Sequence, residues 1–332
     1  MKSASLALFL LFTIGSLQGQ DLGYDTAYLE KPDKQFVFRT YVSRKYTDLL
    51  FKDPSIRFEP NSTLNLGVGF TYQKFTFNLG VPVGFLNPNR QEDWPRFFDL
   101  QSHAYPQNWV IDLFGQFYQG YILKRFEGGE EALLRKDLRL TKLGLSVNYL
   151  LKGDQLSLKA AFHQSEIQKK SAFSPMLGFE IYRAGIRGDS LLIPGQLEPT
   201  GNYTRGDFFH IGPSVGMAGT LVFGKGFFIT GSASGNAGLG FSKADRDPET
   251  RGIGVRTGLF LRGFAGYNGK RFSVNGNYVF KNLGLNPVNG ISQEVNTGNY
   301  RINLIYKFQP GAKFQQTFSR VNPLQIIQRM FD

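Results

Sequence analysis

Apolar residues alternate with polar or small residues over long stretches of the chain. Between residues 64 and 73, apolar side chains alternate with asparagine, glycine, threonine and glutamine, and the pattern resumes over 75–84. A period of two residues predicts a β-strand with one apolar and one polar face. The two stretches meet at Gln73-Lys74, which predicts a tight hairpin.

The same alternation predicts strands along most of the chain. The thirteen candidate strands lie near 36–44, 62–73, 74–85, 97–105, 107–123, 138–151, 155–165, 173–184, 207–223, 227–242, 253–267, 271–281 and 299–309. No segment before residue 320 shows a convincing helical period. A single-chain bacterial barrel has an even number of strands, whereas thirteen candidates are found. The inconsistency falls at 184–206, because the candidate strands on either side of it would run in the same direction. Either a further strand is hidden there or one candidate is not in the sheet, so we expect about 12 strands, with 14 as the alternative.

Short turns alternate with long polar loops between these strands. The short turns fall at 73–74, 105–108, 152–154, 224–226 and 268–270, and the long loops at 46–60, 86–96, 124–137, 243–252 and 282–298. Transmembrane barrels show this asymmetry, with tight periplasmic turns and longer outer loops. Aromatic pairs flank the short turns, as expected of an interfacial girdle: Tyr72 and Phe75, Tyr105 and Trp109, Phe223 and Phe227, and Tyr267 and Phe272.

These features favour an all-β fold, an antiparallel transmembrane up-and-down β-barrel, over a soluble β-sandwich. A sandwich also alternates, but several apolar faces here run for five positions or more, which suits the roughly ten tilted residues that cross a membrane. The opposite faces are rich in glycine, serine, asparagine and threonine. We therefore expect a crowded polar lumen, since an open porin-type pore needs about 16 strands.

The first nineteen residues have the features of a signal peptide. Lys2 precedes an apolar run from Ala4 to Ile14, which is too short to span a bilayer, and small and polar residues follow. Cleavage before Gln20 predicts export to the cell outer membrane, and an uncleaved anchor is the alternative. The expected organisation is a signal peptide (1–19), a periplasmic N-terminal segment (20–35), the barrel (36–309) and a periplasmic tail (310–332).

The tail is expected to contain a short amphipathic helix. Asn322 can cap it with Pro323 at its first position, and Leu324, Ile327 and Phe331 then share one face. Such a helix needs a surface on which to bury that face. We expect it to dock on the periplasmic mouth of the barrel or on a periplasmic partner, and a disordered tail is the alternative.

Composition excludes several other classes of protein. The 332 residues contain no cysteine, so disulfides, thiolate metal sites and cysteine nucleophiles are excluded. Aromatic residues make up 15% of the chain, which excludes a disordered protein. No apolar run reaches the roughly 18 residues that a transmembrane helix needs.

Several stretches together resemble a known family. They are YDTAYLEKPDKQFVFRTYVSRKYTDL (24–49), PNSTLNLGVG (60–69), WVIDLFGQFYQGYIL (109–123), LRLTKLGLSVNYLL (138–151) and SAFSPMLGFEIY (171–182). As an ordered set they resemble a family of outer-membrane barrels from Gram-negative bacteria, catalogued as a domain of unknown function, number forty-four twenty-one. The resemblance implies export and a barrel, and it brings no activity, cofactor or site residue.

Polar residues on the predicted inner face are the candidate site residues. The lumen-lining candidates are Arg39, Asp99, Asp112, Lys159, His163, Glu180, Arg256 and Arg262. We expect the carboxylates and the cations to pair in a structural network. No catalytic, cofactor-binding or metal-binding set is predicted, because no His-x-x-x-His, acidic metal or phosphate-loop motif is present.

The predicted function is that of a non-enzymatic narrow channel or envelope scaffold, with a lipid-modifying barrel enzyme as the alternative. His163 and Ser165 share one face of a predicted strand, and such a pair could supply a nucleophile and a base. A lipid-cleaving barrel needs this pair to face lipid, whereas the pattern directs it into the lumen.

The net charge of +12 bears on the partners. Export argues against nucleic acid, so the expected partners are outer-membrane lipids and lipopolysaccharide, together with a periplasmic or envelope protein. Arg44, Lys45, Lys52 and Arg57 could meet lipid phosphates from an outer loop. An anion-preferring lumen and a solvated charge that aids solubility are the alternatives.

Overall fold

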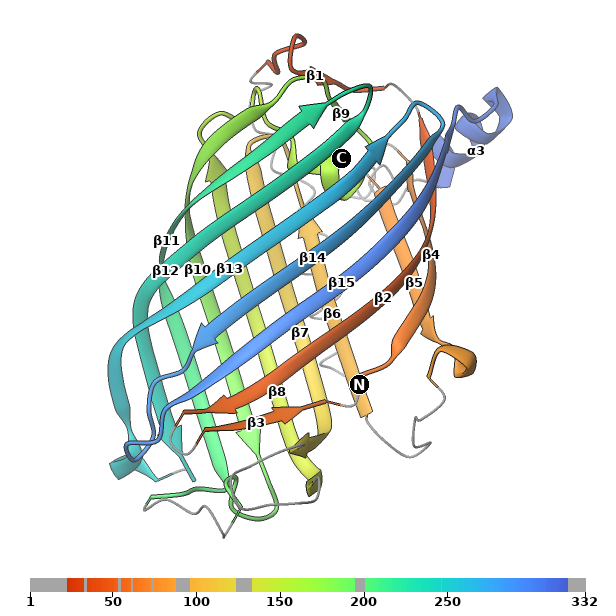
Figure 1. Ribbon diagram of the computed structural model, residues 1–332. Helices are drawn as coiled ribbons and strands as arrows, with labels where there is room; N and C mark the ends of the chain where they lie inside the picture. The colour runs from red at the N-terminus through yellow and green to blue at the C-terminus, as the bar shows by residue number, and fades with distance from the viewer. Residues whose placement is uncertain are drawn as a thin grey trace.

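The structure is a computed structural model that describes residues 23–32, 35–52, 55–60, 62–72, 75–87, 96–123, 133–194, 201–245 and 247–321. It is an antiparallel β-barrel with strongly tilted strands (Figure 1). The predicted signal peptide lies outside the described residues, as does the helix predicted to follow Asn322.

Ten strands close the barrel, each antiparallel to its neighbours. In order around the ring they are β2 (Phe36–Phe51), β15 (Gln293–Phe308), β14 (Phe272–Gly284), β13 (Gly252–Asn268), β12 (Phe227–Ala244), β11 (Arg205–Phe223), β10 (Ala172–Arg187), β8 (Leu133–Leu150), β7 (Trp109–Leu123) and β3 (Ile56–Glu59). The short strand β3 completes the ring by pairing with both β2 and β7.

Three further strands extend the sheet beyond this ring. β4 (Leu64–Tyr72) pairs with β2, β5 (Phe75–Pro82) pairs with β4, and β6 (Arg96–Ala104) pairs with β7. Within the described residues β5 and β6 do not pair with each other. The expected count of twelve strands is therefore not confirmed: the closed ring has ten, and the sheet has thirteen in all.

The strand predicted over 155–165 is wrong. This segment contains the short helix α2 (Leu158–Phe162), whose first turn is capped by the Ser157 hydroxyl. Its backbone carbonyls accept hydrogen bonds from side chains on the inner face of the barrel, including those of Arg39, Asn268 and Asn275. The segment is thus a plug inside the barrel, and its removal from the sheet resolves the strand-direction conflict at 184–206.

The connections divide the barrel into a short-turn end and a loop end. Residues 224–226 and 269–271 are tight turns at the short-turn end, where the plug also lies. Residues 188–204 and 285–292 connect strands at the loop end. The predicted loop 46–60 is shorter than expected, because β2 continues to Phe51 and β3 begins at Ile56.

The outer face of the barrel carries an apolar band. Large apolar side chains at alternate positions are 41–66% exposed, among them Leu66, Val68, Val215, Ile229 and Ile302. Aromatic rings pack in pairs around the short-turn end, edge-on or tilted: Trp109 with Tyr149, Phe227 with Tyr267, Phe272 with Tyr306, and Phe36 with Phe308. An apolar band with an aromatic girdle is typical of barrels that span a membrane.

Two tyrosines of the predicted girdle are buried instead. Tyr105 is 8% exposed and packs on Phe162 of the plug. Tyr72 is 1% exposed and is covered by Phe314. The plug inside the barrel covers Tyr105, and α3 outside the barrel covers Tyr72. The pattern of a single strand cannot indicate such contacts.

An apolar cluster fills the barrel at the loop end. Connecting segments contribute Leu192, Ile193 and Tyr203 from 188–204 and Leu285, Val288 and Ile291 from 285–292, all 4% exposed or less. They pack against inward-facing residues of the strands such as Phe58 and Tyr121. Burial of this much apolar surface holds both connections down inside the barrel mouth.

Smaller elements complete the fold. β1 (Leu29–Glu30) pairs with β9 (Ile167–Gln168) beside the plug, and 3₁₀ turns lie at η2 (Gly84–Leu86) and η4 (Pro248–Thr250). The helix α3 (Ala312–Val321) follows β15 at the short-turn end (Figure 1). Phe314 of α3 packs against Phe36 and Tyr72. The pattern had given no helix before residue 320, so α2 and α3 both correct it.

Candidate functional site

Buried charges occupy the centre of the barrel. The Glu180 carboxylate on β10 forms an ion pair with Lys281 of β14, and both side chains are 1% exposed. Asn236 donates to the same carboxylate, and the Ser146 hydroxyl donates to it at 3.1 Å. Three partners from three other strands therefore satisfy this buried charge, as a carboxylate in such surroundings requires.

A second ion pair lies beside the first. Asp112 of β7 pairs with Arg262 of β13 and is also 2.6 Å from Nδ1 of His103. The Arg262 guanidinium lies 3.7 Å from the centre of the Phe260 ring and donates to Ser232 at 3.2 Å. Because β7 and β13 lie on opposite sides of the ring of strands, this pair connects opposite parts of the wall.

A third group of polar side chains lies closer to β2. Lys142 Nζ donates to the Thr297 hydroxyl at 2.7 Å, and that hydroxyl donates to Gln116 at 3.2 Å. Asp99 accepts from the Tyr118 hydroxyl at 2.6 Å. Together these bonds connect the polar interior from β6 to β15.

One close approach shapes the packing around these charges. Tyr182 of β10 is 1% exposed and lies against Gly144 of β8. A Cβ on residue 144 would be 2.1 Å from the tyrosine ring, so only glycine leaves room for it. The Tyr182 ring in turn lies 5.0 Å from Lys281 Nζ, close enough for a cation–π contact.

The predicted lumen-lining residues all lie inside the barrel, on two kinds of element. Arg39, Asp99, Asp112, Glu180, Arg256 and Arg262 are on strands, whereas Lys159 and His163 are on the plug. Asp112 and Arg262 are partners. Glu180, Lys159 and Arg39 instead take Lys281, Glu166 and Thr71 as partners.

Sequence reasoning missed the lysines of the interior. Lys281, Lys142 and Lys45 point inward, and Lys45 approaches Asp99 at 3.9 Å. Each lies on the polar side of an alternating stretch, so the signal was present in the pattern. Lys45 in particular had been assigned to an outer loop, because the strand was expected to end at residue 44.

The histidine and serine considered as a catalytic pair are both in the plug. His163 ends α2, and the Ser165 hydroxyl is buried with no hydrogen-bond partner among the described residues. Burial lowers the pKa of His163 well below its ordinary value, and the nearby Arg39 charge lowers it further. Both residues lie in the plug, inside the barrel, so the pair does not face lipid.

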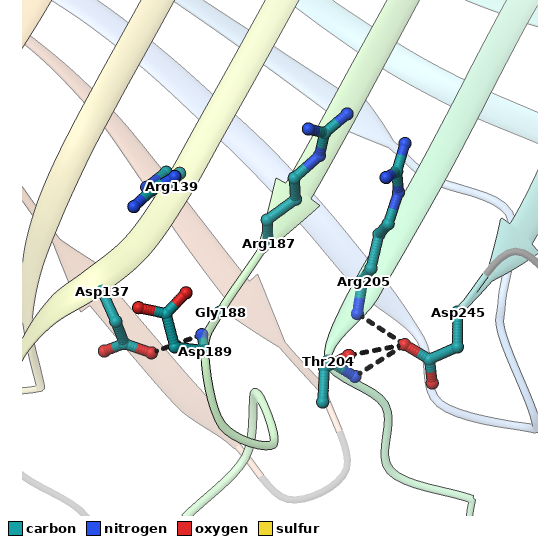
Figure 2. A pocket seen from close by; sticks show the side chains of 8 residues that line it. All are labelled: Asp137, Arg139, Arg187, Gly188, Asp189, Thr204, Arg205 and Asp245. Carbon is teal, nitrogen blue, oxygen red and sulfur yellow. Dashed lines mark hydrogen bonds between the residues drawn. The ribbon is translucent and has the colours of Figure 1, made fainter.

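A pocket of about 360 Å³ lies on the outer side of the barrel at the loop end (Figure 2). It is lined by Asp137, Arg139, Arg187, Gly188, Asp189, Thr204, Arg205 and Asp245. Arg187 of β10 lies directly opposite Arg139 of β8 and directly opposite Arg205 of β11. Figure 2 shows the Arg187 and Arg205 side chains extended along the strands, away from the three carboxylates.

Most carboxylates of this pocket already have partners. Asp137 accepts from Arg135 at 2.8 and 2.9 Å, and Asp245 accepts from Thr204 and from the backbone N–H of Arg205. Arg205 pairs with Asp207 at 2.9 Å. Among the described side chains, Arg139 and Arg187 form no ion pair.

The basic residues predicted to meet lipid phosphates are engaged elsewhere. Lys45 points into the lumen, Lys52 pairs with Glu294 at 2.6 Å, and Arg57 pairs with Asp48 at 2.5 Å. Arg44 donates to Ser62 at 3.1 Å. Arg139 on β8 and Arg187 on β10 form no ion pair among the described side chains.

The described residues contain no group of three or more histidine and acidic side chains arranged to hold a metal ion. None of the described helices is long and apolar enough to cross a membrane.

Comparison with solved structures finds outer-membrane proteins. The outer membrane protease OmpT of Escherichia coli is 11% identical, with 83% of this chain and 97% of that chain covered and a TM-score of 0.35. The toluene transporter TodX of P. putida is 8% identical (84% and 91% covered, TM-score 0.25). Ail of Yersinia pestis is 9% identical (83% and 100% covered, TM-score 0.23). These values carry no argument about activity.

Sequence comparison gives one family. No curated protein sequence matches the chain significantly. The model of the family described as a domain of unknown function (DUF4421) matches residues 23–308, which include every strand of the barrel. The chain therefore belongs to the DUF4421 family.

Proposed function

We propose that this protein is a sealed, non-enzymatic barrel of the outer membrane that acts as an envelope scaffold rather than as a channel. The observation that carries the proposal is the filled interior. Buried ion pairs occupy its centre, the apolar cluster its loop end and the plug its short-turn end. An ion that entered would have to displace side chains that are already paired.

The small cavities near the plug support this proposal. One lies between the plug and the inner wall, at Ala161 and Thr230, and has a volume of about 10 Å³. Another lies beside Tyr105 and Leu156 and has a volume of about 20 Å³. Each has room for about one water molecule, which is too little for a hydrated ion.

The alternative, a lipid-modifying enzyme, has less support. That activity requires a nucleophile and a base that meet lipid. His163 and Ser165 are held in the plug, and Arg39 donates to the His163 carbonyl at 3.2 Å. Their position inside the barrel favours a structural role for both residues.

A scaffold also needs a surface for its partner. The helix α3 extends beyond the barrel wall. Phe314 remains 42% exposed although it contacts the girdle. We propose that this helix meets a periplasmic or envelope protein.

Single-channel recording tests the sealed barrel. The full-length protein, folded and reconstituted in a planar bilayer, should produce no stable conductance steps, because fixed ion pairs and apolar side chains exclude ions from the lumen. A general porin measured in the same bilayer is the positive control. Reproducible unitary steps from the folded protein would favour the channel over the scaffold.

A further inference from the structure

We propose that the outer pocket at the loop end binds the phosphorylated headgroup of an outer-leaflet lipid. Arg139, Arg187 and Arg205 would contact the phosphate. The proposal concerns a surface that takes no part in sealing the lumen, so it can be tested independently of the scaffold function.

The first argument is the register of the three arginines. They occupy directly opposed positions on three adjacent strands. Opposed residues in an antiparallel pair have Cβ atoms about 4.5–5.5 Å apart, and like charges there are destabilising. Arg205 already pairs with Asp207 at 2.9 Å, so the charges of Arg139 and Arg187 are the ones left without a carboxylate. Their opposed placement is unfavourable without an anion between them, and a phosphate accepts bidentate hydrogen bonds from arginine.

The second argument is that the carboxylates that line the pocket do not form ion pairs with Arg139 or Arg187, although Asp207 pairs with Arg205. Asp137 and Asp245 accept hydrogen bonds that hold the strand ends and connecting segments in place. Asp189 lines the pocket and is exposed. In Figure 2 the three carboxylates lie on the loop side of the pocket, whereas the Arg187 and Arg205 guanidinium groups extend along the strands in the opposite direction.

The third argument concerns depth. Farther from the loop end on the same three strands, the outward-facing side chains are apolar. Leu143 on β8, Phe179 on β10 and Val215 on β11 are 46–63% exposed. Arg183, also exposed, lies at the edge of this band, directly opposite Leu143 and Phe209. Cations above an exposed apolar surface suit an amphiphile better than a free anion.

The fourth argument is which lipid leaflet the pocket meets. In transmembrane barrels the longer connections are on the outer side, and the pocket is lined by residues at the ends of two loop-end connections, namely Gly188, Asp189, Thr204 and Asp245. Its volume of about 360 Å³ is within the range of sites that hold small molecules. The ligand is therefore assigned as a phosphorylated lipid of the outer leaflet, for which lipopolysaccharide is the probe.

Binding of purified lipopolysaccharide to the full-length folded protein tests the assignment. In detergent, the wild type should bind lipopolysaccharide at least about tenfold more tightly than the same material after enzymatic dephosphorylation. Arg187→Gln should weaken binding of the phosphorylated form by a similar factor. Arg251→Gln is the matched control, because Arg251 is exposed at the loop end but does not line the pocket.

Two further arms distinguish the source of the phosphate. Inorganic phosphate in millimolar excess should not displace lipopolysaccharide, because it lacks acyl chains to cover the apolar band. Displacement by inorganic phosphate would assign the site to free anions and overturn the lipid proposal. Equal binding of the phosphorylated and dephosphorylated forms by the wild type would also overturn the lipid proposal, whatever the variants show.

Discussion

Replacement of Glu180 by alanine should destabilise the folded barrel by about 3–5 kcal/mol, which is the cost of removing one partner from a buried ion pair. The variant leaves the Lys281 ammonium, 1% exposed, without its carboxylate. Asn236 and Ser146 also lose their acceptor. Urea unfolding in detergent micelles, followed by the shift between unheated and boiled samples on gels, measures the change.

The double variant Glu180→Gln with Lys281→Met is the control for this prediction. It removes both charges while keeping the volume of the pair, so it should recover most of the lost stability. If Glu180→Ala unfolds at the same urea concentration as the wild type, the carboxylate is solvated and the interior is not closed around it.

Val215→Arg should cost about 2–4 kcal/mol of folding free energy, the value for arginine on the lipid face at the bilayer midplane. Val215 lies in the middle of β11 and is 63% exposed on the outer face. The loss arises because the guanidinium must leave water for hydrocarbon. Refolding into lipid vesicles at graded urea concentrations measures it.

The matched control for depth is Ile253→Arg. Ile253 is equally exposed, at 66%, but lies at the loop end of β13. Arginine near an interface costs only about 0–1 kcal/mol. Equal losses at residues 215 and 253 would mean that the outer face does not cross a bilayer, and they would favour a soluble sheet.

The barrel class could be predicted from the sequence because its cause is local. Alternation of side chains along one strand decides which residues face lipid, and that pattern is visible in stretches such as 227–242. The ring closure could not be predicted in the same way. It depends on β3, a strand of four residues that lies in a segment interpreted as a loop.

The plug shows where a two-residue period misleads. Leu156, Leu158, Ala160 and Phe162 alternate as a strand would, yet short apolar runs do not distinguish a strand from a helix. The signal that was overlooked is Ser157, whose hydroxyl accepts from the backbone N–H of Ala160 and caps α2.

Which inward-facing side chains pair with each other cannot be predicted from a single sequence. The alternation predicts that Glu180 faces inward. Its pairing with Lys281, however, depends on the tilt and register of the five strands from β10 to β14. The arginine row has the same origin, because Arg139, Arg187 and Arg205 are brought together only by the pairing of β8, β10 and β11.

Labelling of single cysteine variants tests most directly whether the lumen is sealed, since the chain has no cysteine of its own. Ser234 lies inside the barrel, 2% exposed, and its hydroxyl has no hydrogen-bond partner among the described residues, so Ser234→Cys removes no known bond. Ser190→Cys, at an exposed position, is the matched control. In the folded protein a water-soluble maleimide should label residue 190 readily and residue 234 only after unfolding. Comparable labelling of both in the folded state would show a water-filled lumen and contradict the account.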